Sequence, residues 1–292
     1  MSAPSNFTVF PPRTATPLPL VFDSPHSGFE LPADFAHQVT LDELKTGWDA
    51  FVDELWQPAT QLGAWLLAAK ASRMYIDLNR APNDLDPALL AEPWPESLQP
   101  SRYSERGMGL IRRFALPGRP LYAAPLSVAA VQQRIRDYYQ PYHRQLRTLL
   151  QDLHHRYGSV WHIDCHSMKS RGNAMNIDAD TARPDIVLGD ADGSSCDPDF
   201  TDCIQHSFQR LGYSVAVNHP YKGGHCVRAY GKPAQHFHSV QIEINRQLYM
   251  DEATFRKNHL FNGFQADLHQ VSASIAEFIQ AKLAKSDFAL PS

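Results

Sequence analysis

The chain alternates between short apolar runs and longer stretches in which apolar residues recur at helical spacing. Val52, Leu55, Trp56 and Ala59 recur at intervals that place them on one face of a helix, so residues 40–70 predict a helix. Six short apolar runs that end in polar residues predict strands, within residues 19–28, 72–80, 159–168, 185–190, 213–221 and 239–246.

The remaining pattern completes an alternating order of strands and helices. Further helices are expected over residues 125–157, 200–212 and 251–285, with Pro141 as a kink or break in the first of them. Residues 1–20 are rich in proline and predict an irregular segment, and residues 81–125 predict a long loop of the kind that carries function. This order favours an α/β fold with a mostly parallel sheet, in a single domain over residues 1–292.

Composition narrows the class of protein. The 292 residues include 43% hydrophobic and 20% charged residues and carry a net charge of −4, which gives no broad reason to expect nucleic acid as a partner. The longest apolar runs are shorter than a membrane span, and the N-terminus does not resemble a signal peptide. Four scattered cysteines indicate reduced packing residues, so we expect a cytoplasmic protein without membrane contact.

Polar side chains gather where the predicted strands end. The ends read PHSG with His26, DLNR with Asn79 and Arg80, DCHS with His166, and EINR with Glu243. In open parallel sheets, sites form beyond the carboxyl ends of the strands. Four such ends in one chain are hard to explain by packing alone, so they predict a catalytic or binding site.

Two of these ends carry histidines that suit a metal. Two histidines and a carboxylate form a common catalytic zinc site, so His26 and His166 are expected to bind one divalent ion, with zinc the expected metal. Asp49 and Glu30 are both candidates for the carboxylate, and Asp49 is slightly favoured. Asp164 lies on the same strand face as His166 and is expected to orient its imidazole.

Glu243 lies inside an apolar run, where a carboxylate is costly unless it is paired or functional. It is a candidate general base, and a buried salt bridge to Arg80, Arg228 or Arg246 is the alternative. Arg80, and Arg228 in the glycine-rich segment KGGHCVRAYG, are candidates to bind a substrate carboxylate through a bidentate fork. His225 in that segment is a further candidate of uncertain role.

The set DSPHSG, SRMYIDLNRAPND, HIDCHSM, KGGHCVRAYGKP and HSVQIEINRQLYMDE resembles the N-formylglutamate amidohydrolase family over roughly residues 20–255. Two of the motifs also look like those of zinc carboxypeptidases. The resemblance implies a phosphorylase/hydrolase-like fold with a mixed sheet flanked by helices. It carries metal binding to His26 and His166, catalysis to Glu243, and a carboxylate clamp to Asn79 and Arg80.

One departure from the carboxypeptidase pattern concerns the third ligand. Carboxypeptidases take two ligands from H-x-x-E, but Phe29 stands at the third position after His26, so Asp49 and Glu30 both stay open. The resemblance implies hydrolysis of N-formyl-L-glutamate, in histidine degradation, by a monomer or homo-oligomer. The alternatives are an aminoacylase or carboxypeptidase-like hydrolase of another N-acyl amino acid, and a non-catalytic binder of carboxylated metabolites.

Overall fold

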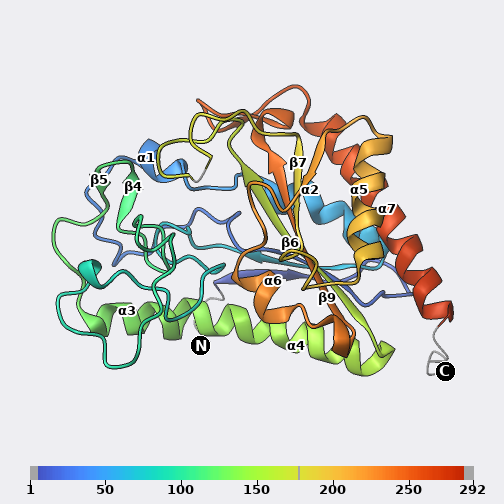
Figure 1. Cartoon of the computed structure of the whole chain (residues 1–292), viewed down its shortest axis with the longest axis horizontal. Helices are drawn as coiled ribbons and strands as arrows, with labels where there is room; N and C mark the ends of the chain where they lie inside the picture. Colours follow the sequence, from blue (N-terminus) through green and yellow to red (C-terminus); the bar gives the residue numbers. More distant parts are fainter. Residues whose placement is uncertain (1–5, 177, 286–292) are drawn as a thin grey trace.

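The computed structural model describes residues 6–176 and 178–285 and is built on one seven-stranded sheet (Figure 1). The strands follow the order β1-β3-β2-β6-β9-β7-β8. Their bounds are β1 (Phe7–Phe10), β2 (Leu20–Ser24), β3 (Trp65–Ala69), β6 (Val160–Met168), β7 (Ile186–Gly189), β8 (Val215–Val217) and β9 (Phe237–Asn245). The four strands β3, β2, β6 and β9 run parallel, whereas β1 and β7 pair antiparallel with β3 and β9. The predicted mixed, mostly parallel sheet is therefore confirmed.

Helices cover both faces of this sheet (Figure 1). The α-helices are α1 (Leu41–Lys45), α2 (Val52–Trp56), α3 (Val128–Arg134), α4 (Gln140–Tyr157), α5 (Pro198–Arg210), α6 (His225–Tyr230) and α7 (Phe261–Lys285). Shorter elements are the single turns η1 (Gln57–Leu62), η2 (Pro87–Leu89), η3 (Ile135–Tyr139), η4 (Pro233–Gln235) and η5 (Arg246–Leu248) and the strands β4 (Phe114–Leu116), β5 (Arg119–Pro120), β10 (Met250–Asp251) and β11 (Arg256–Lys257). Among the described residues, no helix is long and apolar enough to cross a membrane.

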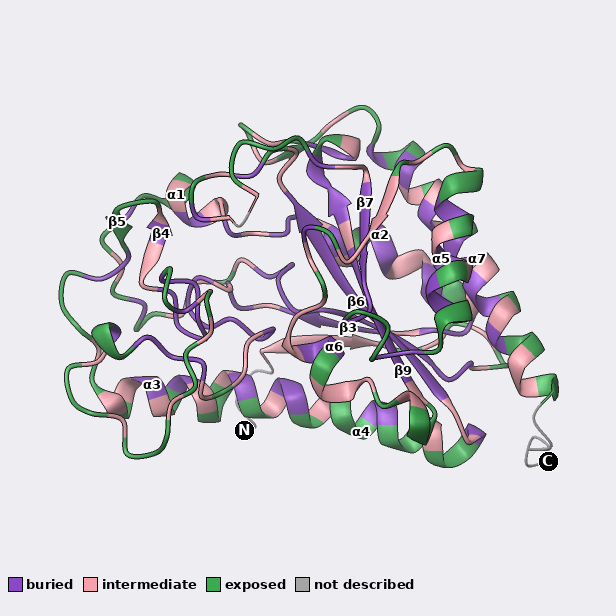
Figure 2. Ribbon diagram, in the orientation of Figure 1, coloured by how far each residue is buried: buried purple, intermediate pink, exposed green. Residues whose placement is uncertain are grey.

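The central strand β6 separates two hydrophobic cores. Its side chains alternate between faces, so Ile163 and Cys165 pack with residues of α2, α5 and α7, while Val160 packs with residues of α4 on the other face. All nine residues of β6 are buried, as Figure 2 shows for the middle of the sheet. One face of β6 is apolar and the other carries the buried polar residues His162, Asp164 and His166.

Three expected elements differ in the structure. The helix predicted over residues 40–70 is interrupted, because residues 46–51 form turns between α1 and α2, and η1 follows α2. Gly63, with a positive φ of 99°, closes η1, and WLLAA then forms β3 between β1 and β2. Residues 72–80, expected as a strand, form buried turns instead. The irregular segment expected over residues 1–20 contains β1, and its first five residues lie outside the described part. Short apolar runs fit either a strand or a buried turn, so periodicity alone misassigned them.

The other helix predictions are largely confirmed. Residues 128–157 are helical throughout, and Pro141 follows the π-turn η3 instead of breaking the helix. Proline cannot donate to the carbonyl four residues earlier, and the Asn6 side chain donates to the Asp137 and Tyr138 carbonyls at 3.3 and 2.9 Å in its place. Within residues 251–285 the first ten form β10, β11 and turns before α7 begins at Phe261.

Candidate active site

Strand ends bring the candidate residues together at the carboxyl edge of the sheet. His26 follows β2, His166 lies near the end of β6, and Glu243 lies directly opposite His166 on β9. Because paired residues of neighbouring strands face the same side, His166 and Glu243 open into the same space. Asp49 reaches this space from the connection between α1 and α2, where its N–H donates to the His26 carbonyl at 3.1 Å.

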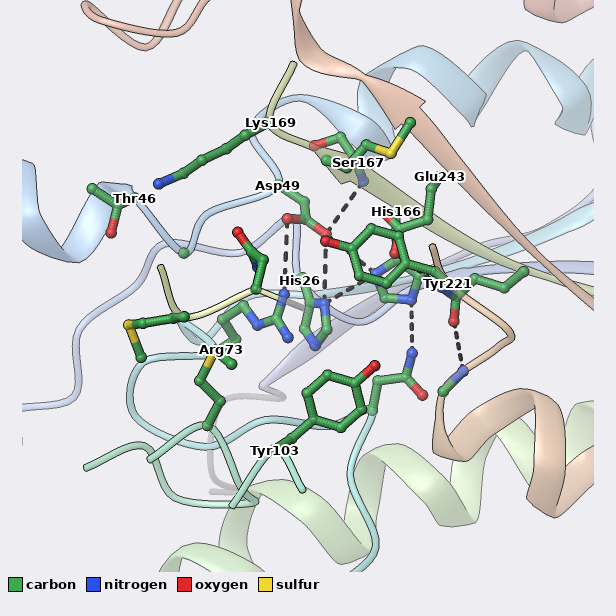
Figure 3. Close-up of a pocket in the computed structure, with 18 of the residues that line it drawn as sticks. His26, Thr46, Asp49, Arg73, Tyr103, His166, Ser167, Lys169, Tyr221 and Glu243 are labelled. Atoms are coloured by element: carbon green, nitrogen blue, oxygen red, sulfur yellow. Dashed lines mark hydrogen bonds and ion pairs between the residues drawn. The ribbon is translucent and has the colours of Figure 1, made fainter. Parts of the chain in front are cut away.

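Three ligand atoms converge at this point (Figure 3). The Nδ1 atoms of His26 and His166 lie 3.0 Å apart, and Asp49 Oδ2 lies 3.5 Å from the first and 3.2 Å from the second. All three residues are at most 2% exposed. The separations resemble the edges of a tetrahedron around zinc, which are roughly 3.3 Å for ligand distances of about 2.0–2.1 Å.

The outer nitrogens of both imidazoles face carboxylates. His26 Nε2 lies 2.6 Å from Asp77 Oδ1, and His166 Nε2 lies 2.7 Å from Asp164 Oδ1. An ionised carboxylate only accepts hydrogen bonds, so both Nε2 atoms carry the proton and donate it. When both rings are neutral, the two Nδ1 atoms present lone pairs to each other and to Asp49.

This arrangement of three acceptors without a proton between them fits a divalent cation. Imidazoles held by outer carboxylates are the usual support of a metal ligand, because the outer bond fixes the tautomer and the ring orientation. Burial by itself would raise the pKa of Asp77, but Arg73 and His26 hold it well below its ordinary value. The residues present therefore suit a bound metal on chemical grounds.

Asp49, and not Glu30, is the carboxylate beside the two histidines. Burial alone would raise the pKa of Asp49, but the adjacent imidazoles of His166 and His26 hold it well below its ordinary value. Its second oxygen, Oδ1, accepts from Arg246 at 2.9 Å, and Arg246 also donates to the Ser167 hydroxyl. Glu30 is exposed, and its backbone pairs with Ala71 outside the site.

Glu243 borders the same space without joining the ligand group. Its Oε1 accepts from the Gln241 side chain at 2.9 Å. Burial raises the pKa of Glu243, and Asp49 adds to this while His166 opposes it. The alternative of a buried salt bridge is not formed by the described residues, since no guanidinium or ammonium lies within ion-pair distance of this carboxylate. A carboxylate in this setting is able to take up a proton.

These groups line a cavity of about 150 Å³ with a strong positive balance. Two carboxylates line it, those of Asp49 and Glu243. Seven cationic side chains also line it: Arg73, Arg80, Arg112, Lys169, Arg183, Lys222 and Arg246. The cavity is therefore suited to an anionic ligand, although the whole chain is acidic.

The sequence model of one family matches residues 18–250 of this chain, the family described as N-formylglutamate amidohydrolase. The chain belongs to this family. It is therefore an amidohydrolase, an enzyme of linear amide C–N bonds.

Three relatives illustrate how much of the chain is similar. N-formylglutamate deformylase from Pseudomonas aeruginosa is 34% identical over 91% of this chain and 93% of its own length. The enzyme of that name from Pseudomonas putida is 32% identical over 82% of this chain and 86% of its own. The crystal structure of N-formylglutamate amidohydrolase from Ralstonia eutropha JMP134 has a TM-score of 0.91 at 42% identity, covering 95% and 99% of the two chains.

In this amidohydrolase the two residues of the predicted carboxylate clamp, Asn79 and Arg80, have different surroundings. The Asn79 amide donates to Asp164 Oδ2 at 2.7 Å and accepts from the Cys226 N–H at 2.8 Å, so its polar groups are occupied within the fold. A Cβ on Gly224 would lie 2.4 Å from that amide, which explains the glycine there. Arg80 does line the cavity, stacks on Tyr103 at 4.4 Å, and donates to the Met108 carbonyl.

Two other candidates lie away from the cavity. Arg228 is exposed on α6 and is not among the cavity's lining residues, so the structure does not place it where a carboxylate bound near His166 would lie. The His225 ring packs near those of Tyr139 and His143, 6.4 and 5.7 Å away. The glycine-rich segment lets the backbone approach Asn79 closely at Gly224, but glycines do not determine the direction of these two side chains.

Several cavity residues had no recognisable signal in the sequence. Arg73 donates to Asp77 at 2.6 Å, and their spacing of four residues was the one available hint. Arg112, Lys169 and Arg183 come from loops without periodicity. Burial lowers the pKa of Arg112 to about 9, with Arg73 adding to the effect, and lowers that of Lys169 to about 8, with Arg246 adding.

A buried histidine anchors the loop that carries Asn79. His143 on α4 donates from Nε2 to the Leu78 carbonyl at 2.8 Å, and its Nδ1 accepts from the Tyr230 hydroxyl at 2.7 Å. Burial lowers the pKa of His143 from 6.5 to about 3. His143 is therefore neutral in the folded protein near neutral pH.

This histidine should make the protein less stable in acid. An unfolded histidine takes up a proton below pH 6.5 whereas the folded one does not, so the contribution is complete above pH 6.5 and is lost as the pH falls toward 3. Between pH 7.5 and 5 we expect it to cost about 2 kcal/mol of unfolding free energy. Between pH 7.5 and 5, the unfolding free energy of His143→Gln, measured with urea, should therefore fall by about 2 kcal/mol less than that of the wild type. The exposed neighbour His155→Gln is the control, and an equal slope in all three proteins would contradict the prediction.

Proposed function

We propose that this amidohydrolase hydrolyses N-formyl-L-glutamate to formate and L-glutamate. The observation that carries the proposal is the cavity, in which three convergent ligand atoms lie beside a surplus of cationic side chains. N-formyl-L-glutamate carries one amide and two carboxylates, and both features find partners there. The names of the relatives from the two Pseudomonas species support the same substrate.

The cluster of His26, Asp49 and His166 would hold the metal, which we propose to be zinc. When bound, zinc polarises a carbonyl and lowers the pKa of a water ligand toward 7. The protein's own contribution is to hold the ligands rigidly. Asp77 and Asp164 fix the two rings from behind, and Arg246 fixes the Asp49 carboxylate. Imidazole and carboxylate donors together are typical of zinc in hydrolases.

Glu243 is the proposed general base. It lies across the strand pair from His166, with no cation bound to its carboxylate among the described residues, so it is available to accept the proton of an attacking water. The same carboxyl then gives that proton to the leaving nitrogen, which departs as the amine of glutamate. A raised pKa brings a carboxyl closer to the working pH, which favours both transfers.

Arg80 is the proposed partner of the carboxylate next to the scissile bond. It follows Asn79, whose amide contacts the Asp164–His166 pair, so its backbone is tied to the ligand group. The guanidinium is held by the Met108 carbonyl and the Tyr103 ring, which leaves donors free toward the cavity. A guanidinium fork fits a carboxylate in two parallel hydrogen bonds.

Release of free L-glutamate from a panel of N-acyl-L-glutamates tests the proposal. The purified protein should hydrolyse N-formyl-L-glutamate with a kcat/KM well above those for its N-acetyl and N-succinyl counterparts. A preference for another acyl group would instead identify an aminoacylase. Ligand binding without any turnover would identify a non-catalytic binder, and either result would contradict the proposed reaction.

A further inference from the structure

Arg112 is a buried cation without a partner. Its side chain is only 8% exposed, yet within residues 6–176 and 178–285 the guanidinium forms no hydrogen bond and no ion pair. The Nε atom is fully buried and unsatisfied, and the group lines the cavity. Burying an unpaired charge is unfavourable, so a protein retains one where a bound ligand supplies the opposite charge.

Lys169 lies on the same cavity and is similarly unpaired. Its ammonium has no hydrogen bond or ion pair among the described residues, and Arg112 is one of the cations that depress its pKa. Figure 3 shows its side chain extended along the cavity toward Thr46. The residue follows the last residue of β6, three positions beyond His166. Strand geometry therefore places its backbone about 10 Å farther along than that of His166.

The other cations of the cavity are already engaged. Arg73 is bound to Asp77, Arg246 to Asp49, Arg183 to Asp178 and Lys222 to Asp192. Arg80 is held beside the ligand group and is assigned above to the carboxylate next to the amide. Arg112 and Lys169 are therefore available to bind a second anionic group of the ligand, farther from the scissile bond.

We propose that Arg112, assisted by Lys169, binds the side-chain carboxylate of the substrate and thereby selects acidic N-acyl amino acids. The inference rests on the proposed function, because it concerns the second carboxylate of that substrate. The two cations repel each other across the cavity until a carboxylate lies between them. Binding of a neutral side chain would leave both uncompensated, so the site rejects it as well as favouring the acid.

N-formyl-L-glutamine is the matched probe because its side-chain amide has the shape of a carboxylate without the charge. The wild type should prefer N-formyl-L-glutamate over it by about 100-fold or more in kcat/KM. Arg112→Met should reduce that ratio at least about 10-fold, through a loss on the glutamate substrate and no loss on the glutamine substrate, and Lys169→Met should reduce it less. Arg113→Met is the control, since Arg113 pairs with Asp86 and does not line the cavity.

Melting temperature separates a specificity role from a structural one. Removing an unpaired buried cation should leave the Tm of Arg112→Met equal to or above that of the wild type, whereas loss of a structural group would lower it. Equal losses on both substrates, an unchanged ratio, or a lower Tm would overturn the inference.

A binding measurement keeps the inference testable without turnover. L-glutamate should raise the Tm of the wild type more than L-glutamine does, and Arg112→Met should abolish that difference. If the wild type releases no formate yet shows this difference, the proposed reaction fails and the carboxylate site stands. If it releases formate but Arg112→Met keeps the wild-type preference, the reaction stands and the inference fails.

Discussion

Glu243→Gln should lower kcat for N-formyl-L-glutamate by about 100- to 10,000-fold, the usual range for a lost general acid–base group. Glutamine keeps the size of the side chain and its contact with Gln241, but it cannot take up the proton of the attacking water. The change leaves His26, Asp49 and His166 untouched. Turnover under saturating substrate is the measurement, because the loss belongs to the chemical step and not to binding.

Metal content distinguishes a lost base from a lost metal site. The bound zinc per chain in Glu243→Gln should equal that of the wild type. Glu277→Gln, which changes an exposed carboxylate on α7, should leave turnover unchanged. Near-normal kcat in Glu243→Gln would assign the base to another group.

Removing the metal should lower formate release by at least about 1,000-fold, since a metal supplies several kcal/mol of transition-state stabilisation. Dialysis against a chelator followed by added zinc should restore the activity. Asp49→Asn should reduce the zinc content, because it replaces one of the three convergent ligand atoms. It also weakens the partner of Arg246, so its Tm should fall as well.

Glu30→Gln is the matched control for Asp49→Asn. Both carboxylates are candidates by sequence, but Glu30 is exposed and Asp49 is buried between the histidines. Glu30→Gln should retain zinc and turnover. Zinc loss in Glu30→Gln, or full activity after complete removal of the metal, would contradict the proposed ligand set.

The sequence predicts the central strands of the sheet more clearly than the outer elements. The strands β2, β6 and β9 are predictable because each carries buried apolar residues and ends in polar residues at the carboxyl edge of the sheet. The strand β3 is missed because WLLAA is a short apolar run that directly follows the helical pattern, although Gly63 separates the two. Residues 72–80 were misassigned because their apolar side chains pack in buried turns.

The residues of the candidate site differ in the same way, since those on or just after central strands are predictable from the sequence and those on connections are not. His26, His166 and Glu243 were readable because each lies on or just after a central strand. The position of Asp49 depends on how the connection between α1 and α2 folds back over β2, which no local pattern encodes. Arg112 could not be recognised at all, since what distinguishes it is the absence of a partner among the described residues.

The pairing of β6 with β9 has a consequence for how relatives can vary in length. Nine residues pair in unbroken register, and His162, Asp164 and His166 lie opposite Ser239, Gln241 and Glu243. An insertion or deletion of a single residue ahead of Glu243 in β9 would turn Glu243 to the opposite face, toward the apolar core, and one ahead of His166 in β6 would do the same to His166. Viable changes in chain length should therefore be confined to the loops, and a gap within either strand would mark a relative that has lost the reaction.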